Sequence, residues 1–486
     1  MSPLPLTKLV TTRDRESKPV FEPSLNTTLP SIPPRSLRTI AVLGNYGNRN
    51  LGDEATLVAV IQHVGRRFPQ ARICGLSLDL PDTHGRHGIE VFPSSRWAIR
   101  DGSPVMPPTR ASHTFSQSAW AAARQTIKGK VKVFRPLYTF LRTMHAVFQS
   151  AKGCCGELVF LIRCFTFLRS IDLLIVAGGG QLDDQWGGPI NFPYTIFKWS
   201  VLARLTRTRL AFLSVGAGRL DSPVSRILVK RALSMAGYRS LRDERSWKLL
   251  RTMGIAAESH VFPDLVYGLE TDPRLHQSIE QNRCASVGIN PFPHYDYRYY
   301  PQSDNMAYRI YVSRIASFAA WLMQRRYRVF FFPTQLRADT RVIQDIRRIL
   351  EDSGTMIPQK DAFDCPINTI EDLLARISQA DIVVSGRFHG ILLSFLLNIP
   401  VLGISNQSKM DDLMLEMGQG EYLLSADNCP AEEMIRVFTS LEANMKPAKE
   451  QIKRRNVEYR QLLEAQFDHL LYDSPSVRNH LSNPGG

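Results

Sequence analysis

Short apolar segments alternate with longer amphipathic segments along most of this chain, and this alternation restricts the folds open to it. The apolar segment "LRTIAVLG" at 37–44 has the length of a buried strand, and the helical pattern "GDEATLVAVIQHVGRRF" at 52–68 follows it. Strands that alternate with helices in this way predict parallel sheets covered by helices on both faces. The pattern therefore predicts an α/β fold.

The alternation occurs in two runs, at 37–275 and 283–425, which a polar stretch separates. Because 486 residues exceed what one hydrophobic core organises, each run predicts a Rossmann-like lobe of its own, and the two lobes are expected to face a cleft. The remaining segments are predicted to be a flexible leader at 1–36, C-terminal helices at 426–475 and a flexible tail at 476–486.

Basic residues are concentrated in one insertion within the first run. The formal net charge of the chain is +15, and residues 94–170 contribute +10 of it, with aromatic side chains interleaved. Such a segment suits an anionic surface: phospholipid headgroups, lipid-linked sugar diphosphates, acidic polysaccharide or nucleic acid. A solvated insertion that binds nothing is an equally good interpretation. No nucleic-acid reading module is recognisable, so nucleic acid is not expected as a partner.

Cysteine usage and hydropathy favour a cytoplasmic protein. The seven cysteines are scattered without a C-x-x-C spacing, so neither a zinc site nor a disulfide framework is indicated, and no metal is predicted. The most apolar window, at 158–176, contains Arg163, Arg169 and Asp172, which argues against a membrane span. Any membrane contact is therefore predicted to be peripheral, at the inner face.

Cationic side chains follow several predicted strands, where ligands of open parallel sheets bind. Burying an unpaired guanidinium is unfavourable, so these groups are expected to face the cleft and bind a small, highly charged anion. Residues two apart in an extended segment point the same way, which would let Arg387 and His389 share one target. The four groups are Arg387 and His389 after the strand at 381–386, Lys409 after the strand at 400–405, and Arg242 at the end of the strand at 238–242.

Structural alternatives exist for these residues. Arg242 is followed by Asp243 and Glu244, with which it can form an ordinary ion pair at a helix start. Lys409 can be an exposed lysine, and His389 can be a structural histidine bonded to the backbone.

Two glycine-rich loops of the first run carry acidic and amide groups. The loop "GNYGNRNLGDEA" at 44–55 has neither a Walker nor a dinucleotide-binding pattern, and its acids would occupy the first helical turn, where a phosphate is disfavoured. In "AGGGQLDDQWGG" at 177–188, glycines permit close approach of a ligand. The loops predict binding of acceptor hydroxyls by Asn45, Asn50, Asp53, Gly179, Gly180, Asp183 and Asp184, with Asp53 as a candidate base. The alternatives are a capping role for Asp53 and a divalent cation at Asp183 and Asp184.

A tyrosine-rich loop in the second run, "NPFPHYDYRYYP" at 290–301, is a further candidate for acceptor binding. It places His294 among aromatic rings of the kind that stack on sugars, although a structural aromatic loop fits equally well.

Taken together, these segments resemble the polysaccharide pyruvyl transferase family. The matching pieces occur in family order over about 38–418, without the basic insertion and the termini. They are "GNYGNRNLGDEA", "DLLIVAGGGQLDD", "SVGAG", "SLRDERSWKLLRTMGI", "VFPDLVYGL", "VGINP" and "VVSGRFHGILLSFLLNIPVLGISNQSKMDDLMLEMG".

The resemblance implies a two-lobed fold like that of GT-B glycosyltransferases, and transfer of pyruvate from phosphoenolpyruvate to a sugar as a ketal. It implies that Arg242, Arg387, His389 and Lys409 bind or activate this donor substrate, and that no cofactor is needed. Phosphoenolpyruvate carries a carboxylate and a phosphate, which suits a converging set of cations. We expect His389, Arg387 and Asp53 to be catalytic, with His389 as the acid.

Two other functions remain open from the sequence. A nucleotide-sugar glycosyltransferase shares the two-lobed architecture, and a non-catalytic saccharide-binding or membrane-docking protein would use the basic insertion. The acceptor sugar, its attachment to a lipid or a polymer, and the oligomeric state are not indicated by the residues.

Overall fold

The computed structural model describes residues 37–98, 155–185, 187–255, 259–275, 285–300, 303–357, 362–363 and 366–472. The predicted leader at 1–36, most of the basic insertion and the tail at 476–486 lie outside the described residues.

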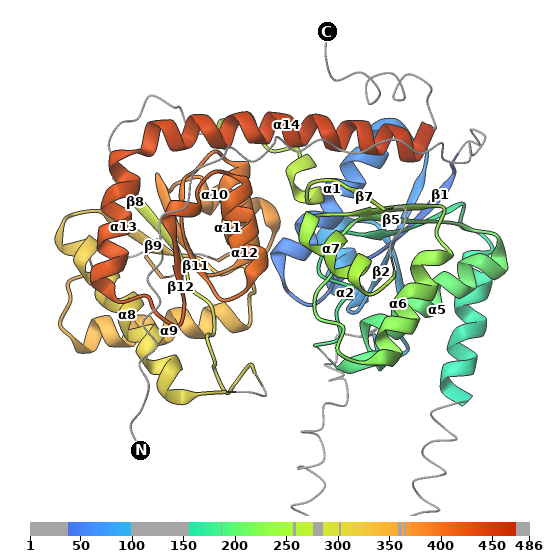
Figure 1. The fold of residues 1–486 in the computed structure, drawn as a ribbon, viewed down its shortest axis with the longest axis horizontal. Helices are drawn as coiled ribbons and strands as arrows, with labels where there is room; N and C mark the ends of the chain where they lie inside the picture. The colour runs from blue at the N-terminus through green and yellow to red at the C-terminus, as the bar shows by residue number, and fades with distance from the viewer. Residues whose placement is uncertain are drawn as a thin grey trace, which may run out of the picture.

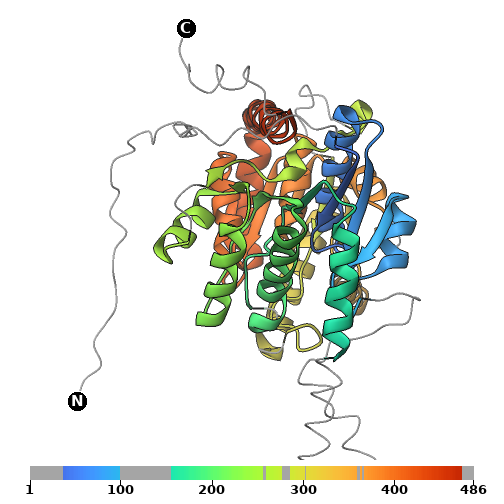
Figure 2. The same cartoon turned by 90° about the vertical axis from the view of Figure 1, so that its right-hand side faces the viewer.

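The first lobe is built on a seven-stranded parallel sheet with the order β3-β2-β1-β4-β5-β6-β7 (Figure 1). Its central strand β4 is buried at every position, as expected for a strand covered on both faces. Helices α5 and α6 lie side by side over the sheet (Figure 2). The strands are β1 Thr39–Leu43, β2 Arg72–Ser77, β3 Glu90–Pro93, β4 Leu173–Ala177, β5 Arg209–Val215, β6 Tyr238–Leu241 and β7 His260–Val261. The helices are α1 Leu51–Arg67, α2 Leu80–His87, η2 Gly188–Ile190, α5 Phe192–Thr206, α6 Pro223–Ser234, α7 Glu244–Thr252, η3 Leu265–Gly268 and η4 Pro273–Leu275.

The second lobe contains a five-stranded parallel sheet with the order β12-β11-β10-β8-β9. The strands are β8 Ser286–Asn290, β9 Arg328–Phe331, β10 Ile382–Ser385, β11 Val401–Ser405 and β12 Leu423–Ser425. The helices are α8 Asn305–Gln324, α9 Ala338–Asp352, α10 Ile370–Ile377, α11 Phe388–Leu396, α12 Ser408–Glu416 and η5 Gly420–Tyr422. The predicted α/β class with two Rossmann-like lobes is therefore confirmed.

Two C-terminal helices, α13 (Ala431–Ala443) and α14 (Met445–Tyr472), follow the second sheet. The sequence predicts a break near Pro447, but the chain breaks at Asn444, because a proline in the first turn of a helix needs no hydrogen-bond donor. Helix α14 runs along both lobes (Figure 1) and contacts α11 and η3.

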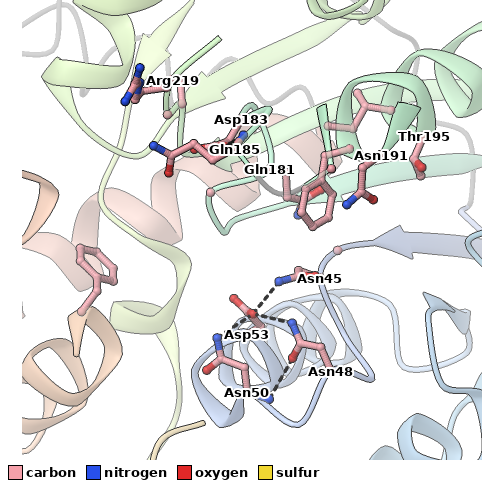
Figure 3. A pocket seen from close by; sticks show the side chains of 18 of the residues that line it. Asn45, Asn48, Asn50, Asp53, Gln181, Asp183, Gln185, Asn191, Thr195 and Arg219 are labelled. Atoms are coloured by element: carbon pink, nitrogen blue, oxygen red, sulfur yellow. Dashed lines mark hydrogen bonds between the residues drawn. The ribbon is translucent and has the colours of Figure 1, made fainter. Parts of the chain in front are cut away.

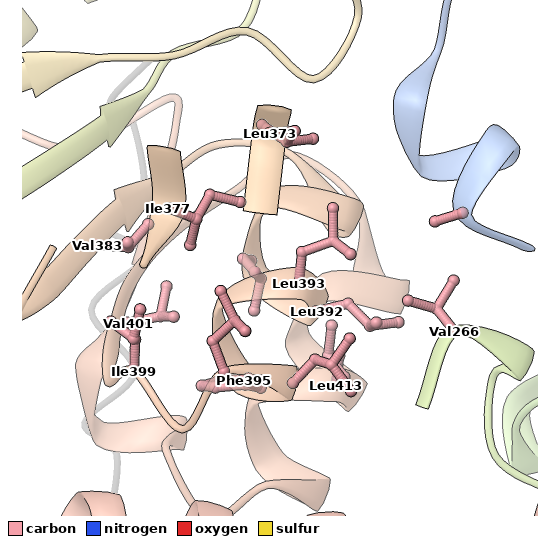
Figure 4. Packing of buried hydrophobic residues seen from close by; sticks show 14 of the residues in the cluster. Val266, Leu373, Ile377, Val383, Leu392, Leu393, Phe395, Ile399, Val401 and Leu413 are labelled. Atoms are coloured by element: carbon pink, nitrogen blue, oxygen red, sulfur yellow. The ribbon is translucent and has the colours of Figure 1, made fainter. Parts of the chain in front are cut away.

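One hydrophobic core continues from lobe to lobe. Val266 of η3 points toward Leu392 of α11 (Figure 4), and both side chains are fully buried in a cluster that includes residues of both sheets. The lobes are thus packed against each other through apolar side chains as well as through α14.

The end of the predicted basic insertion belongs to the first lobe. A helical segment at 155–168 buries Phe160, Cys164 and Leu168 in the core beside α5. Its charge pattern did not indicate this packing. None of the helices in the described part of the chain combines the length and apolarity that a membrane crossing needs.

Candidate functional site

A cavity of about 2560 Å³ lies between the lobes. It is lined by the two glycine-rich loops of the first lobe and by the loops that follow β9, β10 and β11 of the second. Pockets for one small ligand usually measure about 300–1,000 Å³. The cavity therefore has room for a small donor and a larger acceptor together.

Arg387 enters this cavity from the carboxyl end of β10. It caps α11 with an extended backbone, and its guanidinium Nε donates a hydrogen bond to Asp339 Oδ1 at 2.9 Å. Asp339 is completely buried, and its Oδ2 accepts the backbone N–H groups of Thr334 (3.0 Å) and Gln335 (2.9 Å). The buried carboxylate therefore fixes the guanidinium in place. In the sequence, Asp339 is one acidic residue near the start of a predicted helix, and nothing there indicated that it would bind Arg387.

Arg242 reaches the cavity from the end of β6. Its Nε lies 3.1 Å from Asp243 Oδ2, and its Nη1 lies 3.5 Å from Asp264 Oδ2. The predicted ion pair with Asp243 is thus present, and Asp243 also caps helix α7. Arg242 nevertheless lines the cavity. Its guanidinium carbon lies 4.6 Å from the centre of the Phe388 ring.

His389 is held by contacts that its sequence position did not predict. It lies inside helix α11, so the expectation of an extended segment shared with Arg387 is wrong. Its imidazole packs against Gly52 of α1 in the other lobe, where an added Cβ would lie 2.0 Å from the ring. Its Nε2 is buried and has no hydrogen-bond partner among the described residues, so it is not bonded to backbone there. That nitrogen remains available to a ligand.

Lys409, in the first turn of α12, completes the set of cationic groups. Its Nζ lies 5.6 Å from the centre of the Phe388 ring, on whose face Arg242 also packs. Burial lowers the pKa of Lys409 to about 8, with a further contribution from Arg242. The lysine is therefore not an ordinary exposed one. It is mostly protonated at neutral pH.

The four groups influence one another electrostatically, which requires that they lie close together. Burial lowers the pKa of His389 to about 3, and the positive charges of Arg242, Lys409 and Arg387 add to this effect. His389 is consequently neutral in the ligand-free protein. An anion placed among these groups would offset the repulsion that depresses its pKa.

Asp53 is the centre of an amide-lined wall in the first lobe (Figure 3). Its Oδ2 accepts hydrogen bonds from the side-chain amides of Asn45 (2.9 Å), Asn48 (3.2 Å) and Asn50 (2.9 Å). Asn50, not Asp53, caps helix α1. Burial raises the pKa of Asp53 to about 6. All three amide hydrogen bonds go to its Oδ2, so none of them occupies Oδ1. The arrangement leaves one carboxylate oxygen for a ligand hydroxyl.

The remaining predicted residues are only partly brought together. Gly180 and Asp183 line the cavity, whereas Gly179 does not. Asp184 instead accepts the backbone N–H groups of Asp221 (3.1 Å) and Ser222 (2.9 Å) at the start of α6. His294 is also outside the cavity lining, and its Nε2 pairs with Asp427 at 3.1 Å. From the tyrosine-rich loop, it is Tyr299 and Tyr300 that reach the cavity.

Replacing Gly52 by Ala is expected to lower the turnover of this site about a hundredfold, because the new Cβ displaces the imidazole of His389. Gly65→Ala in the same helix is the matched control, since a Cβ there meets nothing within 4 Å. Turnover and the melting temperature of both variants are to be measured. Full turnover by Gly52→Ala would show that the position of His389 does not matter.

A sequence model of the family described as "Polysaccharide pyruvyl transferase" matches residues 50–408. No curated protein matches the chain in sequence. Among solved structures, a Listeria monocytogenes protein described as a UDP-N-acetylglucosamine 2-epimerase gives a TM-score of 0.52 at 9% identity, covering 90% of this chain and 98% of that one. Another UDP-N-acetylglucosamine 2-epimerase gives 0.50 at 11% identity, covering 90% and 97%. These likenesses show the fold alone, which is of the two-lobed GT-B type.

Proposed function

The chain belongs to the polysaccharide pyruvyl transferase family, and from this premise we propose that it transfers pyruvate from phosphoenolpyruvate to a sugar. The acceptor would be a polysaccharide or its lipid-linked precursor, and the products a pyruvate ketal and phosphate. The observation that carries the proposal is the convergence of Arg242, Arg387, His389 and Lys409 on one interlobe cavity. Phosphoenolpyruvate bears a carboxylate and a phosphate on adjacent atoms, which matches several converging cations.

The donor would be activated by a proton from His389. Burial and then the three nearby cations depress the His389 pKa. When phosphoenolpyruvate binds, its negative charges offset the contribution of the cations, and the imidazole takes up a proton. Transfer of this proton to the donor methylene carbon forms the methyl group and leaves an electrophilic neighbouring carbon. Arg242, Arg387 and Lys409 stabilise the anionic groups during this step.

The acceptor would react through two hydroxyl groups. Asp53 takes the proton of the first attacking hydroxyl on its Oδ1, and a carboxyl group with a pKa of about 6 is mostly ionised at neutral pH. Phosphate then leaves, and the second hydroxyl attacks the same carbon to close the ketal. One of the two hydroxyl protons replaces the proton that His389 gave to the methylene carbon. The other hydroxyl proton leaves with the phosphate.

Ligand binding and product mass test this function together. We expect phosphoenolpyruvate to raise the melting temperature of the full chain, while UDP-glucose does not; saturation at a hundredfold excess over Kd adds about 2.7 kcal/mol of stability. Mass spectrometry of the surface glycan made with this protein should show an increase of about 70 units per ketal, which is pyruvate minus water. Stabilisation by UDP-glucose alone would favour a glycosyltransferase instead.

We propose further that the protein acts in the cytoplasm, with peripheral contact to an anionic membrane through residues 94–170. The support is the net charge of +10 in this segment, most of which lies outside the described residues. The scattered cysteines support a reducing compartment; those within the described residues are unpaired. Nucleic acid remains excluded from the proposed partners.

A further inference from the structure

Large apolar side chains project from one region of the first lobe, beside the mouth of the interlobe cavity. We propose that this region, the apolar rim, docks on an anionic phospholipid bilayer with the cavity mouth facing the lipid. The proposal rests on the membrane contact proposed above and assigns that contact to folded residues. Each side chain of the apolar rim is between 46% and 81% exposed. The apolar rim consists of Trp97, Leu158, Val159, Ile162, Ile190 and Val224.

The helical segment at 155–168 has an apolar face on each side. One face packs inward, where Phe160 is buried in the core of the first lobe. The other face carries Leu158, Val159 and Ile162, whose spacing of three and four residues places them on one side of the helix. The inward face already fixes the helix to the lobe, so the outward side chains are not needed for that packing. Exposed apolar patches of this kind mark contact with a membrane or with another protein.

The apolar rim lies at the mouth of the cavity. Trp97 and Ile190 line the cavity and are nevertheless exposed, so they mark its edge. The helical segment at 155–168 stands beside α5 (Figure 2), and its Glu157 also lines the cavity. Helix η2, which contains Ile190, contacts both α5 and α6, and Val224 lies in the first turn of α6. These contacts bring the exposed apolar side chains to one edge of the lobe.

The charge of this helical layer favours an anionic bilayer over a second copy of the chain. The helical segment at 155–168, α5 and α6 together contain one acidic residue, Glu157, and six basic residues. Two copies that met through this layer would place like charges face to face, which is unfavourable. Anionic headgroups attract the same charges, while the acyl chains accept the apolar side chains. The basic residues are Arg163, Lys198, Arg204, Arg226, Lys230 and Arg231.

The described part of the chain is interrupted at this same edge. It ends at Ala98, next to Trp97, and resumes at Cys155, just before Glu157. Residues 99–154 contain nine Lys and Arg against one acidic residue. Because both ends of this stretch are attached beside the apolar rim, its basic charge is tethered there and adds to the attraction for anionic lipid.

Flotation of the full chain with vesicles tests the docking. Vesicles of phosphatidylcholine mixed equally with phosphatidylglycerol should bind the protein about tenfold more tightly than vesicles of phosphatidylcholine alone. The double variant Leu158→Ser, Ile162→Ser should weaken binding to the anionic vesicles by a factor of about ten, because two apolar side chains no longer enter the lipid. The double variant Leu415→Ser, Val457→Ser should bind like the unaltered protein. It is the matched control, since these residues of α12 and α14 are similarly exposed outside the apolar rim.

Two further measurements separate docking of the apolar rim from attraction by basic charge alone. At a salt concentration of about 1 M the Debye length is about 3 Å, so electrostatic attraction is screened. Weaker binding that depends on Leu158 and Ile162 should persist there. Vesicles with brominated acyl chains should quench the fluorescence of Trp97, which lies at the cavity mouth. Trp97→Phe should therefore reduce the quenching, whereas Trp321→Phe, in α8 of the second lobe, should not.

The outcomes decide between the possible occupants of the apolar rim. Unchanged vesicle binding by folded Leu158→Ser, Ile162→Ser, or quenching that does not depend on Trp97, would overturn the proposal. A dimer of the unaltered chain that becomes a monomer in this double variant, measured by light scattering, would also overturn it in favour of a second copy. If the double variant does not fold, Val224→Ser at the same edge takes its place in all of these measurements.

Thermal stabilisation by phosphoenolpyruvate, measured without vesicles, keeps the docking and the reaction apart. The double variant Leu158→Ser, Ile162→Ser should be stabilised as much as the unaltered protein, because neither residue lines the cavity. Stabilisation of the unaltered protein without any vesicle binding would defeat the docking and leave the proposed reaction intact. Vesicle binding through the apolar rim without stabilisation would support the docking and defeat the reaction.

Discussion

Replacing His389 by Gln is expected to reduce turnover by a factor of about 10²–10⁴, which is the usual contribution of a positioned general acid. Glutamine keeps a polar side chain of similar reach but cannot transfer a proton at neutral pH. The fold should persist, because His389 Nε2 has no hydrogen-bond partner to lose within the described residues. Phosphate release gives the rate, and thermal stabilisation by phosphoenolpyruvate shows whether the donor still binds.

The control for this substitution is His294→Gln. His294 is also buried in the second lobe, but it pairs with Asp427 outside the cavity lining, so its loss should leave the rate unchanged. A His389→Gln protein with the normal rate would remove this residue from the mechanism.

Proton uptake provides a second readout for His389. In the donor-free protein the pKa of the His389 imidazole is about 3, and it should rise when the donor is bound. At a pH between these two pKa values, donor binding therefore takes up a proton. Donor affinity therefore increases as the pH falls through this window. Calorimetry in two buffers of different ionisation enthalpy measures the proton uptake. The His389→Gln protein should take up fewer protons on binding, because only the donor itself can then change its protonation.

Replacing Arg387 by Met is expected to lower the free energy of unfolding by about 3–5 kcal/mol and to abolish donor binding. The loss of stability arises because the completely buried carboxylate of Asp339 would lose its counter-ion. In the double variant Arg387→Met, Asp339→Asn, the uncompensated charge is gone. Urea unfolding should show that most of the stability returns, whereas turnover does not.

Arg298→Met separates the structural from the chemical role of Arg387. Arg298 forms ion pairs with Asp296 and Asp345 in the same lobe, outside the cavity lining, so its loss should reduce stability while folded protein keeps its turnover. A double variant at 387 and 339 that regained turnover would contradict donor binding by Arg387. Unchanged stability of Arg387→Met would contradict the importance of the buried pair.

Much of the fold was predictable because its signals are local. The apolar runs of β1, β4 and β10 and the amphipathic pattern of α1 identify the elements within a few residues. The short strand β3 and helix α2 were missed, since α2 itself contains Pro81 and Gly85 and β3 has only four residues. Strand β12, only three residues long, was missed as well. Short elements depend on pairing with a neighbour more than on their own residues.

From the sequence, only those residues of the candidate site that directly follow predicted strands could be identified. Arg242, Arg387 and Lys409 follow strands of parallel sheets, and the carboxyl ends of such strands meet at one edge. His294 also follows a strand, β8, but its loop turns it toward Asp427 instead. Position in a loop does not define the direction of a side chain.

The amino-acid sequence by itself determined the two α/β lobes, the family and the cationic residues at the strand ends, because periodicity and motif spacing are properties of neighbouring residues. Only the tertiary structure decided that Asp339 fixes Arg387, that Gly52 makes room for His389, and that Lys198 shares Glu157 with Arg96. These partners are far apart in the chain, and their contacts depend on how the elements of each lobe, and the two lobes together, pack around one cavity.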